Sequence, residues 1–328
     1  MGGVLVTGGA GYIGSHVVRQ LGERHEQVVV LDDLSTGHAG AVLHGELVLG
    51  DAGDATLIRE LLQDYRLDAV MHFAARTVVP ESVSDPLKYY RENSEKTRAL
   101  AEAALEAGVE NFIFSSSAAV YGIPPSIPVE EDAPLYPINP YGSSKLVSEW
   151  MLRDVAASGA LRPVSLRYFN VAGADPGGRI GQSTPEATLL IKVACEAAIG
   201  LREEVAIYGT DYSTPDGTGV RDFIHVEDLA SAHIQCLDHL RSGGQAATYN
   251  VGYGHGYSVR EVLEAVERVH GAELPVREAD RRPGDPPALV ADTGRIRTEL
   301  AWEPRYDDLD EIVRSALAWE QKLCGAHA

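Results

Sequence analysis

Cysteine, long apolar runs and leader-like segments are scarce or missing in this chain. The cysteines lie far apart and form neither a CxxC pair nor a His/Cys cluster with metal-ligand spacing. They are Cys195, Cys236 and Cys324. We therefore expect free thiols, no bound metal and a cytoplasmic protein. No run of about 18 apolar residues occurs, and the first residues lack the basic and apolar segments of a signal peptide, so neither a membrane span nor a leader is expected.

Basic residues are also fewer than acidic ones. The chain has 28 lysines and arginines against 48 acidic residues, a formal net charge of −20. Because no basic run stands out, nucleic acid and anionic membranes are poor partners. A substrate carrying phosphate is not excluded, since a few local arginines suffice to hold one. With 328 residues, 45% of them hydrophobic, the chain is long enough for one large or two coupled domains.

The first 23 residues have the pattern of a dinucleotide-binding turn. Residues 3–7 are apolar and β-branched, which predicts a buried parallel strand, and an amphipathic helix follows to about residue 23. Between them stand Gly8, Gly11 and Gly14, which suit a tight turn, a close approach to pyrophosphate and close packing of the helix on the strand. The pyrophosphate would lie at the helix N-terminus.

Asp32 ends the next predicted strand, residues 27–31, and follows Gly14 by 18 residues. An acid at this place binds the ribose hydroxyls of the adenosine and repels a 2′-phosphate, so NAD is favoured over NADP. A carboxylate that caps a helix or a loop is the alternative interpretation.

The alternation of strands and helices continues through the first half. We predict strands at 46–49, 68–73, 111–114 and 163–168, and helices at 55–65, 86–107 and 140–158. This order indicates a doubly wound parallel sheet, in which ligands bind beyond the carboxyl ends of the strands. Asp51 and Ser117 follow such strand ends, although a loop acid and a turn-forming serine remain alternatives. His72, inside an apolar strand, fits a core residue better than a catalyst.

Tyr141 and Lys145 are four residues apart on a predicted helix, so their side chains share one face. A nearby ammonium lowers the pKa of a phenol, and such a phenol acts as general base and acid on a hydroxyl. Taken alone, the pair is weak evidence, because two surface residues on an ordinary helix have the same spacing. The glycine turn at the N-terminus supports the functional interpretation.

Composition changes after residue 173. The second half predicts a smaller α/β lobe with helices at 185–200, 226–240, 258–270 and 308–323 and short strands at 205–208 and 249–251. Its elements interleave with the first domain. We expect an NAD-binding domain at residues 1–173 plus about 217–245, and a substrate domain at 174–216 and 246–328.

The glycine turn, Asp32, Ser117 and the Tyr141/Lys145 pair occur in the order of the extended short-chain dehydrogenases/reductases. Within the NAD-dependent epimerase/dehydratase family of that group, the sequence resembles the UDP-glucose 4-epimerases closely. The matching stretches are residues 7–14, 31–37, 72–75, 112–122, 139–145, 167–174, 217–228 and 281–285.

The resemblance implies roles for individual residues. Tyr141 would be the catalytic base, Lys145 its partner, and Ser117 the hydroxyl that holds the sugar 4-oxygen. NAD would be bound by Gly8, Gly11, Tyr12, Ile13, Gly14, Asp32, Asp51, Ala52, Phe73, Ala74, Ala75, Asn93, Ser115, Tyr141, Lys145 and Tyr168. The UDP-sugar would be bound by Ser117, Tyr141, Asn170, Leu189, Ala206, Tyr208, Arg221, Arg282, Asp285 and Leu289.

The implied reaction is the reversible 4-epimerisation of UDP-glucose and UDP-galactose through a transient 4-keto sugar and bound NADH. Guanidinium groups suit the diphosphate. The resemblance also implies a homodimer, paired through the helices at 86–107 and 140–158.

The sequence departs from the family pattern at three positions. Arg76 stands where a lysine is frequent, and Leu189 stands where an amide or imidazole is frequent. Leu289 occupies the position of a gate beside the hexose, where tyrosine excludes N-acetyl sugars. Because leucine is of intermediate size, partial activity on UDP-N-acetylhexosamines is a hypothesis.

The sequence also bears on other activities of the same fold. Nucleotide-sugar dehydratases and UDP-glucuronate decarboxylases carry acidic residues after the active-site hydroxyl, whereas Ser117 is followed by Ala118 and Ala119. A 4-epimerase of UDP-arabinose, UDP-xylose or UDP-glucuronate shares the chemistry and stays open. A catalytically dead NAD-binding regulatory protein is less consistent with the retained Tyr141 and Lys145.

Overall fold

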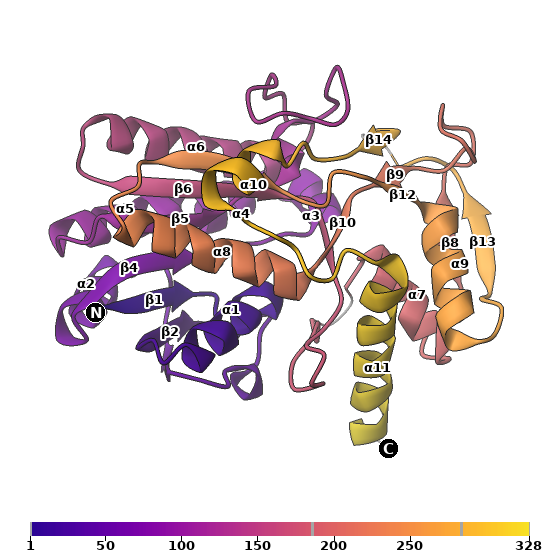
Figure 1. Cartoon of the computed structure of the whole chain (residues 1–328), viewed down its shortest axis with the longest axis horizontal. Coiled ribbons are helices and arrows are strands. Elements are labelled where there is room, and N and C mark those ends of the chain that lie inside the picture. The colour runs from indigo at the N-terminus through magenta and orange to yellow at the C-terminus, as the bar shows by residue number, and fades with distance from the viewer. Residues whose placement is uncertain (1, 185–186, 283–284, 328) are drawn as a thin grey trace.

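A computed structural model describes residues 2–184, 187–282 and 285–327. Its central feature is a seven-stranded parallel sheet with the order β11-β6-β5-β4-β1-β2-β3 (Figure 1). The strands are β1 (Gly3–Thr7), β2 (Val28–Asp32), β3 (Glu46–Leu49), β4 (Leu67–His72), β5 (Asn111–Ser115), β6 (Arg162–Tyr168) and β11 (Ala247–Val251). The predicted doubly wound α/β fold is confirmed.

Side chains of the central strands alternate between two buried faces. On β1, Val4 and Val6 pack with helices α1 (Tyr12–Glu23) and α8 (Val226–Arg241). Leu5 points to the other face and packs with α2 (Ala55–Asp64), α5 (Lys96–Glu106) and α6 (Pro140–Ala157). Because both faces are covered, the strands are mainly apolar, which is why they were predictable as short apolar runs.

The long helix expected at 86–107 is irregular. It consists of α4 (Pro86–Tyr89), a π-helical segment η2 (Tyr90–Glu95) and α5. A separate short helix, α3 (Val79–Ser84), precedes it and was not predicted. Helix α6 begins at Pro140 because the side chain of Asn139 accepts a hydrogen bond from the amide of Gly142.

One part of the expected domain division differs from the sheet topology. Residues 246–328 were assigned to the substrate domain, yet β11 pairs in parallel with β6, with Ala247 opposite Val164 and Val251 opposite Tyr168. The first residues of that range therefore complete the large sheet.

The smaller lobe is built from short strands and from helices that lie beside them (Figure 1). β8 (Val205–Tyr208) pairs with β13 (Val276–Ala279), and β9 (Val220–Arg221) lies between β12 (Tyr257–Ser258) and β14 (Ala288–Leu289). β10 (Phe223–His225) pairs with β7 (Asn170–Ala172). Its helices are α7 (Leu190–Ala198), α9 (Val259–His270) and α11 (Leu309–His327), whereas α10 (Gly294–Leu300) contacts β11 of the large sheet and α8.

Helix α7 is shorter than expected, because 185–200 was predicted and the helix begins at Leu190. Residues 185 and 186 of that prediction lie outside the described residues. The short 3-10 segments η1 (Ala39–Ala41) and η3 (Ala118–Val120) complete the element order.

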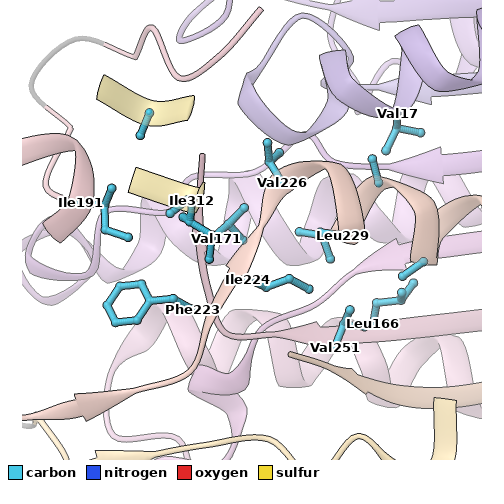
Figure 2. Close-up of a cluster of buried hydrophobic side chains, with 14 of the residues drawn as sticks. Val17, Leu166, Val171, Ile191, Phe223, Ile224, Val226, Leu229, Val251 and Ile312 are labelled. Atoms are coloured by element: carbon cyan, nitrogen blue, oxygen red, sulfur yellow. The ribbon is translucent and has the colours of Figure 1, made fainter. Parts of the chain in front are cut away.

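One hydrophobic cluster joins the two parts of the molecule. Figure 2 shows Val17 of α1, Leu166 of β6 and Leu229 of α8 in the same cluster as Phe223 of β10 and Ile312 of α11. The smaller lobe therefore shares its core with one face of the large sheet.

Membrane-spanning helices and metal-ligand clusters are both absent from the described residues. No helix among these residues is long and apolar enough to cross a membrane. No group of three or more His, Cys, Asp or Glu side chains in the same residues is arranged to hold a metal ion.

Candidate functional site

The glycine turn joins the end of β1 to α1. Gly8 has a φ of +73°, and a Cβ placed on it would lie 2.5 Å from the amide nitrogen of Ala74. A Cβ on Gly14 would lie 2.3 Å from the carbonyl oxygen of Gly8, whereas one on Gly11 would meet only that oxygen, at 3.2 Å. The turn therefore packs tightly against its own backbone at Gly8 and Gly14 and is more open at Gly11.

The N-terminus of α1 is available to an anion. Gly11 is its N-cap residue, and no side chain of the described residues caps it. Tyr12 and Ile13 therefore begin the helix with free backbone N–H groups, which attract negative charge. The Tyr12 hydroxyl donates to the carbonyl oxygen of Gly173 at 2.6 Å, which ties the turn to the segment after β7.

Asp32 ends β2 beside this turn and is buried. Its two carboxylate oxygens accept from the amides of Ala10 at 2.9 Å and Leu34 at 2.8 Å. Both hydrogen bonds fix the carboxylate at the carboxyl edge of the sheet. Asp51 lies after β3, where its exposed side chain accepts from Lys96 at 2.8 Å and from the amide of Gly53, and the adjoining Ala52 is buried.

The end of β4 lies next to the glycine turn. The amides of Phe73 and Ala74 both donate to the carbonyl oxygen of Thr7, at 2.8 and 3.1 Å. His72 is bonded to the hydroxyls of Thr7 and Thr97 at 2.7 and 3.0 Å, and burial lowers its pKa to about 3. The prediction that His72 is a satisfied core residue is confirmed. Ala75 follows in the same segment, at the carboxyl edge of the sheet.

Asn93 lies in the π-helical segment and is buried. Its side-chain amide bonds the backbone of Arg76 on both sides, at 2.8 and 3.1 Å, and donates to the Ser144 hydroxyl at 2.9 Å. These contacts hold the segment after β4 against α6. Both polar atoms of the Asn93 side chain are engaged within the protein.

The serines after β5 converge with α6. The Lys145 ammonium donates to the carbonyl oxygen of Ser115 at 2.8 Å. The Ser115 hydroxyl is bonded to the Tyr168 hydroxyl, and the Ser116 hydroxyl donates to Glu149. Ser117 starts the 3-10 segment, where its hydroxyl accepts from the amide of Ala119 at 3.2 Å.

Tyr141 and Lys145 are both buried on α6. Burial raises the pKa of Tyr141, although a hydrogen bond with Ser117 acts in the opposite direction. Burial also lowers the pKa of Lys145 to about 7, against the charge of Glu149. The net direction expected for the Tyr141 pKa is therefore wrong for this structure, because burial outweighs the Ser117 hydrogen bond that acts to lower it.

Arg221 lies on β9 and is largely buried. Its guanidinium donates to the Val220 carbonyl oxygen at 2.8 Å and lies 3.9 Å from a carboxylate oxygen of Asp285. Burial lowers its pKa. A cation with few partners in such a place suits an anionic ligand.

Arg282 and Tyr208 form a second part of this lobe. The guanidinium carbon lies 3.8 Å from the centre of the Tyr208 ring, so the two planar groups can present a joint face. Tyr208 ends β8, two residues after Ala206. Residues 283 and 284, between Arg282 and Asp285, lie outside the described residues.

Two further predicted residues line a small cavity between the lobes. Asn170 opens β7 and Leu189 is the N-cap residue of α7, and the cavity wall also includes Tyr12 and Trp319. The glycine turn and the proposed sugar-nucleotide contacts are therefore adjacent in space.

Leu289 of β14 pairs in register with Arg221 of β9. Its side chain packs on a buried cluster that includes Ala118, Tyr121 and Phe169. Since Ala118 follows Ser117 directly, this packing brings Leu289 to the same side of the molecule as the candidate catalytic residues.

Sequence reasoning missed the buried ion pair beneath this site. Glu149 of α6 binds Arg167 of β6, with the shortest nitrogen–oxygen distance 2.6 Å. Glu149 follows Lys145 by the spacing that separates Lys145 from Tyr141, a signal that was available in the sequence. That Glu149 pairs with Arg167 of β6 could not be predicted, because a pairing between a helix and a distant strand leaves no local pattern in the sequence.

Together, the doubly wound sheet, the open glycine turn and the buried tyrosine–lysine pair define a dinucleotide-binding protein with a candidate proton-transfer site. The model of the NAD dependent epimerase/dehydratase family matches residues 4–252. The chain belongs to that family.

Individual relatives cover almost the whole chain. A UDP-glucose 4-epimerase of Azospirillum brasilense is 58% identical over 98% of this chain and 92% of its own length. The crystal structure of UDP-glucose 4-epimerase from Brucella ovis in complex with NAD is 46% identical, with a TM-score of 0.94 over 97% of this chain and 98% of that one. The UDP-Glc/GlcNAc 4-epimerase of Campylobacter jejuni is 47% identical, with a TM-score of 0.86 over 98% and 100%.

Proposed function

We propose that this protein is an NAD-dependent isomerase that interconverts UDP-glucose and UDP-galactose by epimerisation at C4. The observation that carries the proposal is the convergence of Ser117, Tyr141 and Lys145 at the edge of the sheet where the glycine turn also opens. Relatives named UDP-glucose 4-epimerase, 58% and 46% identical over nearly the full chain, support it.

The residues at the N-terminus of α1 fit a dinucleotide. The open approach at Gly11 and the free N–H groups of the first turn suit the pyrophosphate, and Asp32 suits the adenosine ribose. Phe73, Ala74, Ala75, Ser115 and Tyr168 would surround the rest of the cofactor. When bound, NAD supplies the redox chemistry by accepting a hydride from C4 of the sugar and returning it to either face.

The chain's own residues carry out the proton transfer. Tyr141 takes the proton of the sugar 4-hydroxyl and returns it, and Ser117 holds the 4-oxygen beside it. The buried position of Tyr141 excludes water, which would otherwise compete for the proton. Lys145 in its charged form favours the phenolate and therefore assists the transfer.

The smaller lobe would hold the UDP portion. Arg221 and Arg282 suit the diphosphate, Asp285 the uridine ribose, and Asn170 the phosphate oxygens. Ala206 and Tyr208 suit the uracil. The hexose would have few fixed contacts, which lets the 4-keto sugar turn over between the two hydride transfers.

Substrate breadth is a finer part of the proposal. Leu289 is smaller than tyrosine and lies beside the buried cluster that includes Ala118. We expect partial turnover of UDP-N-acetylglucosamine, an activity that the name of the Campylobacter jejuni relative states for that protein. A 4-epimerase of another UDP-sugar and a catalytically dead NAD-binding regulator are the less favoured alternatives.

Incubation of the purified protein with UDP-galactose, followed by anion-exchange separation of the products, tests the proposal. We expect UDP-glucose without net NADH formation, and Tyr141→Phe lowers the rate by about 10²–10⁴-fold. UDP-N-acetylglucosamine, UDP-glucuronate and UDP-arabinose are measured alongside. Turnover confined to one of these other sugars would support the alternative epimerase, and no turnover with NAD bound would support the regulator.

Assembly and location are further proposals. Val83 of α3, Leu87 of α4 and Trp150 of α6 are exposed apolar side chains on helices that contact one another. This surface supports a homodimer that buries it, as expected for helices at 86–107 and 140–158. The measured mass in solution tests the dimer, and Leu87→Glu should yield monomers. The free cysteines support a cytoplasmic location, which fractionation of the source cells tests.

A further inference from the structure

Three ionisable side chains follow one another along the buried face of α6. Tyr141, Lys145 and Glu149 are spaced by four residues each, so consecutive side chains lie on one face with their Cβ atoms roughly 5–6 Å apart. All three are buried. Only the first two have roles in the proposed reaction, and a buried carboxylate directly beneath them calls for a physical explanation.

Glu149 contacts the segment that carries the candidate catalytic serine. One of its oxygens accepts from the Ser116 hydroxyl and from Arg167 Nε, the latter at 3.0 Å. The other oxygen accepts from Arg167 at 2.6 and 3.2 Å. Ser116 lies between Ser115, which accepts from Lys145, and Ser117. Lys145 and Glu149 therefore bind two consecutive residues, Ser115 and Ser116, at the end of β5.

Arg167 is itself held from the far side. Its remaining guanidinium nitrogen donates to the Tyr121 hydroxyl at 3.0 Å and to the Glu131 carbonyl oxygen at 2.9 Å. The Tyr121 hydroxyl donates in turn to Asn250 at 2.7 Å. Hydrogen bonds thus connect the Glu149–Arg167 ion pair to β11 and to the loop after η3, and these contacts restrict its movement.

The charges that face Lys145 come from several elements. Glu149 raises the pKa of Lys145, in opposition to its burial. The titratable groups that the contacts place near it are Tyr141, one turn away on α6, His72 of β4, whose pKa its charge lowers, and Tyr168 of β6, whose hydroxyl is bonded to that of Ser115. His72 is neutral near pH 7 because its pKa is about 3. Among the described residues, Glu149 is the carboxylate whose charge acts on Lys145, and it also pairs with Arg167.

We propose that Glu149, held by Arg167, is a positioning residue that keeps Lys145 charged and fixes the Ser115–Ser117 strand end beside Tyr141. The inference rests on the proposed epimerase function, in which charged Lys145 assists Tyr141. It gives Glu149 two separable effects. The charge of Glu149 sets the pH at which Lys145 loses its proton. The length of its side chain sets the position of Ser115–Ser117.

Two substitutions separate these effects. Glu149→Gln removes the charge with little change of shape, so the alkaline limb of the kcat profile should move down by about one pH unit, a tenfold loss of rate beyond that limb. Glu149→Asp keeps the charge but shortens the side chain, so kcat falls while the limb stays in place. An unmoved limb in Glu149→Gln, or an equal shift in Glu149→Asp, would overturn the proposal.

A stability measurement tests the same coupling without turnover. Lys145 is charged in the folded protein only below its pKa of about 7, so Glu149 stabilises it there. The difference in Tm between the unsubstituted protein and Glu149→Gln should thus be larger at about pH 6 than at about pH 9. Asp228→Asn is the control, because Asp228 is a buried carboxylate bonded to Tyr253 and backbone amides. Its effect on Tm should be equal at both pH values.

The two readouts distinguish failure of this inference from failure of the proposed function. If the unsubstituted protein epimerises no UDP-sugar but the Tm difference depends on pH as stated, the proposed function falls and the coupling of Glu149 to Lys145 stands. If epimerisation is found and the Tm difference for Glu149→Gln is the same at both pH values, the inference falls and the function stands.

Discussion

Gly14→Ala tests whether the glycine turn is as tight as the structure indicates. The added methyl carbon would lie 2.3 Å from the carbonyl oxygen of Gly8, 2.8 Å from the Cα of Gly9 and 3.0 Å from the carbonyl carbon of Gly8. All three atoms belong to the backbone, so no side chain can rotate to make room. The turn itself must shift, and with it the surface offered to the pyrophosphate.

The expected size follows from two opposing effects. Alanine is favoured over glycine inside a helix by up to about 1 kcal/mol. Overpacking against a fixed backbone costs about 1–3 kcal/mol. The net loss of stability is therefore about 0–2 kcal/mol, or a fall in Tm of up to roughly 3 °C for a chain of this length. A distortion of the turn that costs NAD about 1–2 kcal/mol of binding corresponds to roughly 5–30-fold in affinity.

The assay measures Tm and the NAD retained by the purified protein, quantified after denaturation. Gly325→Ala is the matched control, because Gly325 also lies in a helix and an added Cβ there meets no atom within 4 Å. We expect the control to keep its NAD and its Tm. If Gly14→Ala behaves like the control in both measurements, the turn is not constrained as described.

The remaining predictions concern substrate binding and pH. Arg282→Lys removes the planar stack of the guanidinium on Tyr208, which is worth about 0.5–2 kcal/mol. KM for UDP-galactose should therefore rise roughly 2–30-fold with kcat unchanged. This rise in KM should be larger than the rise in Arg281→Lys. A fall in kcat at constant KM would contradict this. Burial lowers the pKa of His233 to about 4, so unfolding takes up a proton below about pH 6.5 and stability falls with pH down to about 4. His233→Gln should flatten the slope of Tm against pH in that window, and an unchanged slope would refute the assignment.

The elements of the large sheet were predictable because both its faces are covered. Each strand is then a short apolar run, and Gly8, Gly11 and Gly14 mark the first turn without ambiguity. The two-residue strands β9, β12 and β14 were not predictable, because pairing between distant segments forms them. Helix α7 was extended too far, and β11 was placed in the wrong lobe, because no local pattern reports which sheet a short strand joins.

The candidate site was predictable where its chemistry is local. The four-residue spacing of Tyr141 and Lys145 and the serines after β5 are visible in one stretch each. The direction of the Tyr141 pKa was not, because it depends on how deeply the fold buries the phenol. Arg167 also escaped notice, since its partner Glu149 is brought to it only by the packing of α6 on the sheet.

The late arrival of β11 has a consequence for how the protein is made. Strand β6 ends at residue 168, but its outer neighbour is complete only at residue 251, which is 83 residues later (251 − 168). At ribosomal rates of about 5–20 residues per second, the nascent chain exposes an unpaired strand edge for roughly 4–17 s. Such an edge is a template for misassembly with other chains. Shielding of the growing polypeptide during that interval should therefore raise the yield of folded protein.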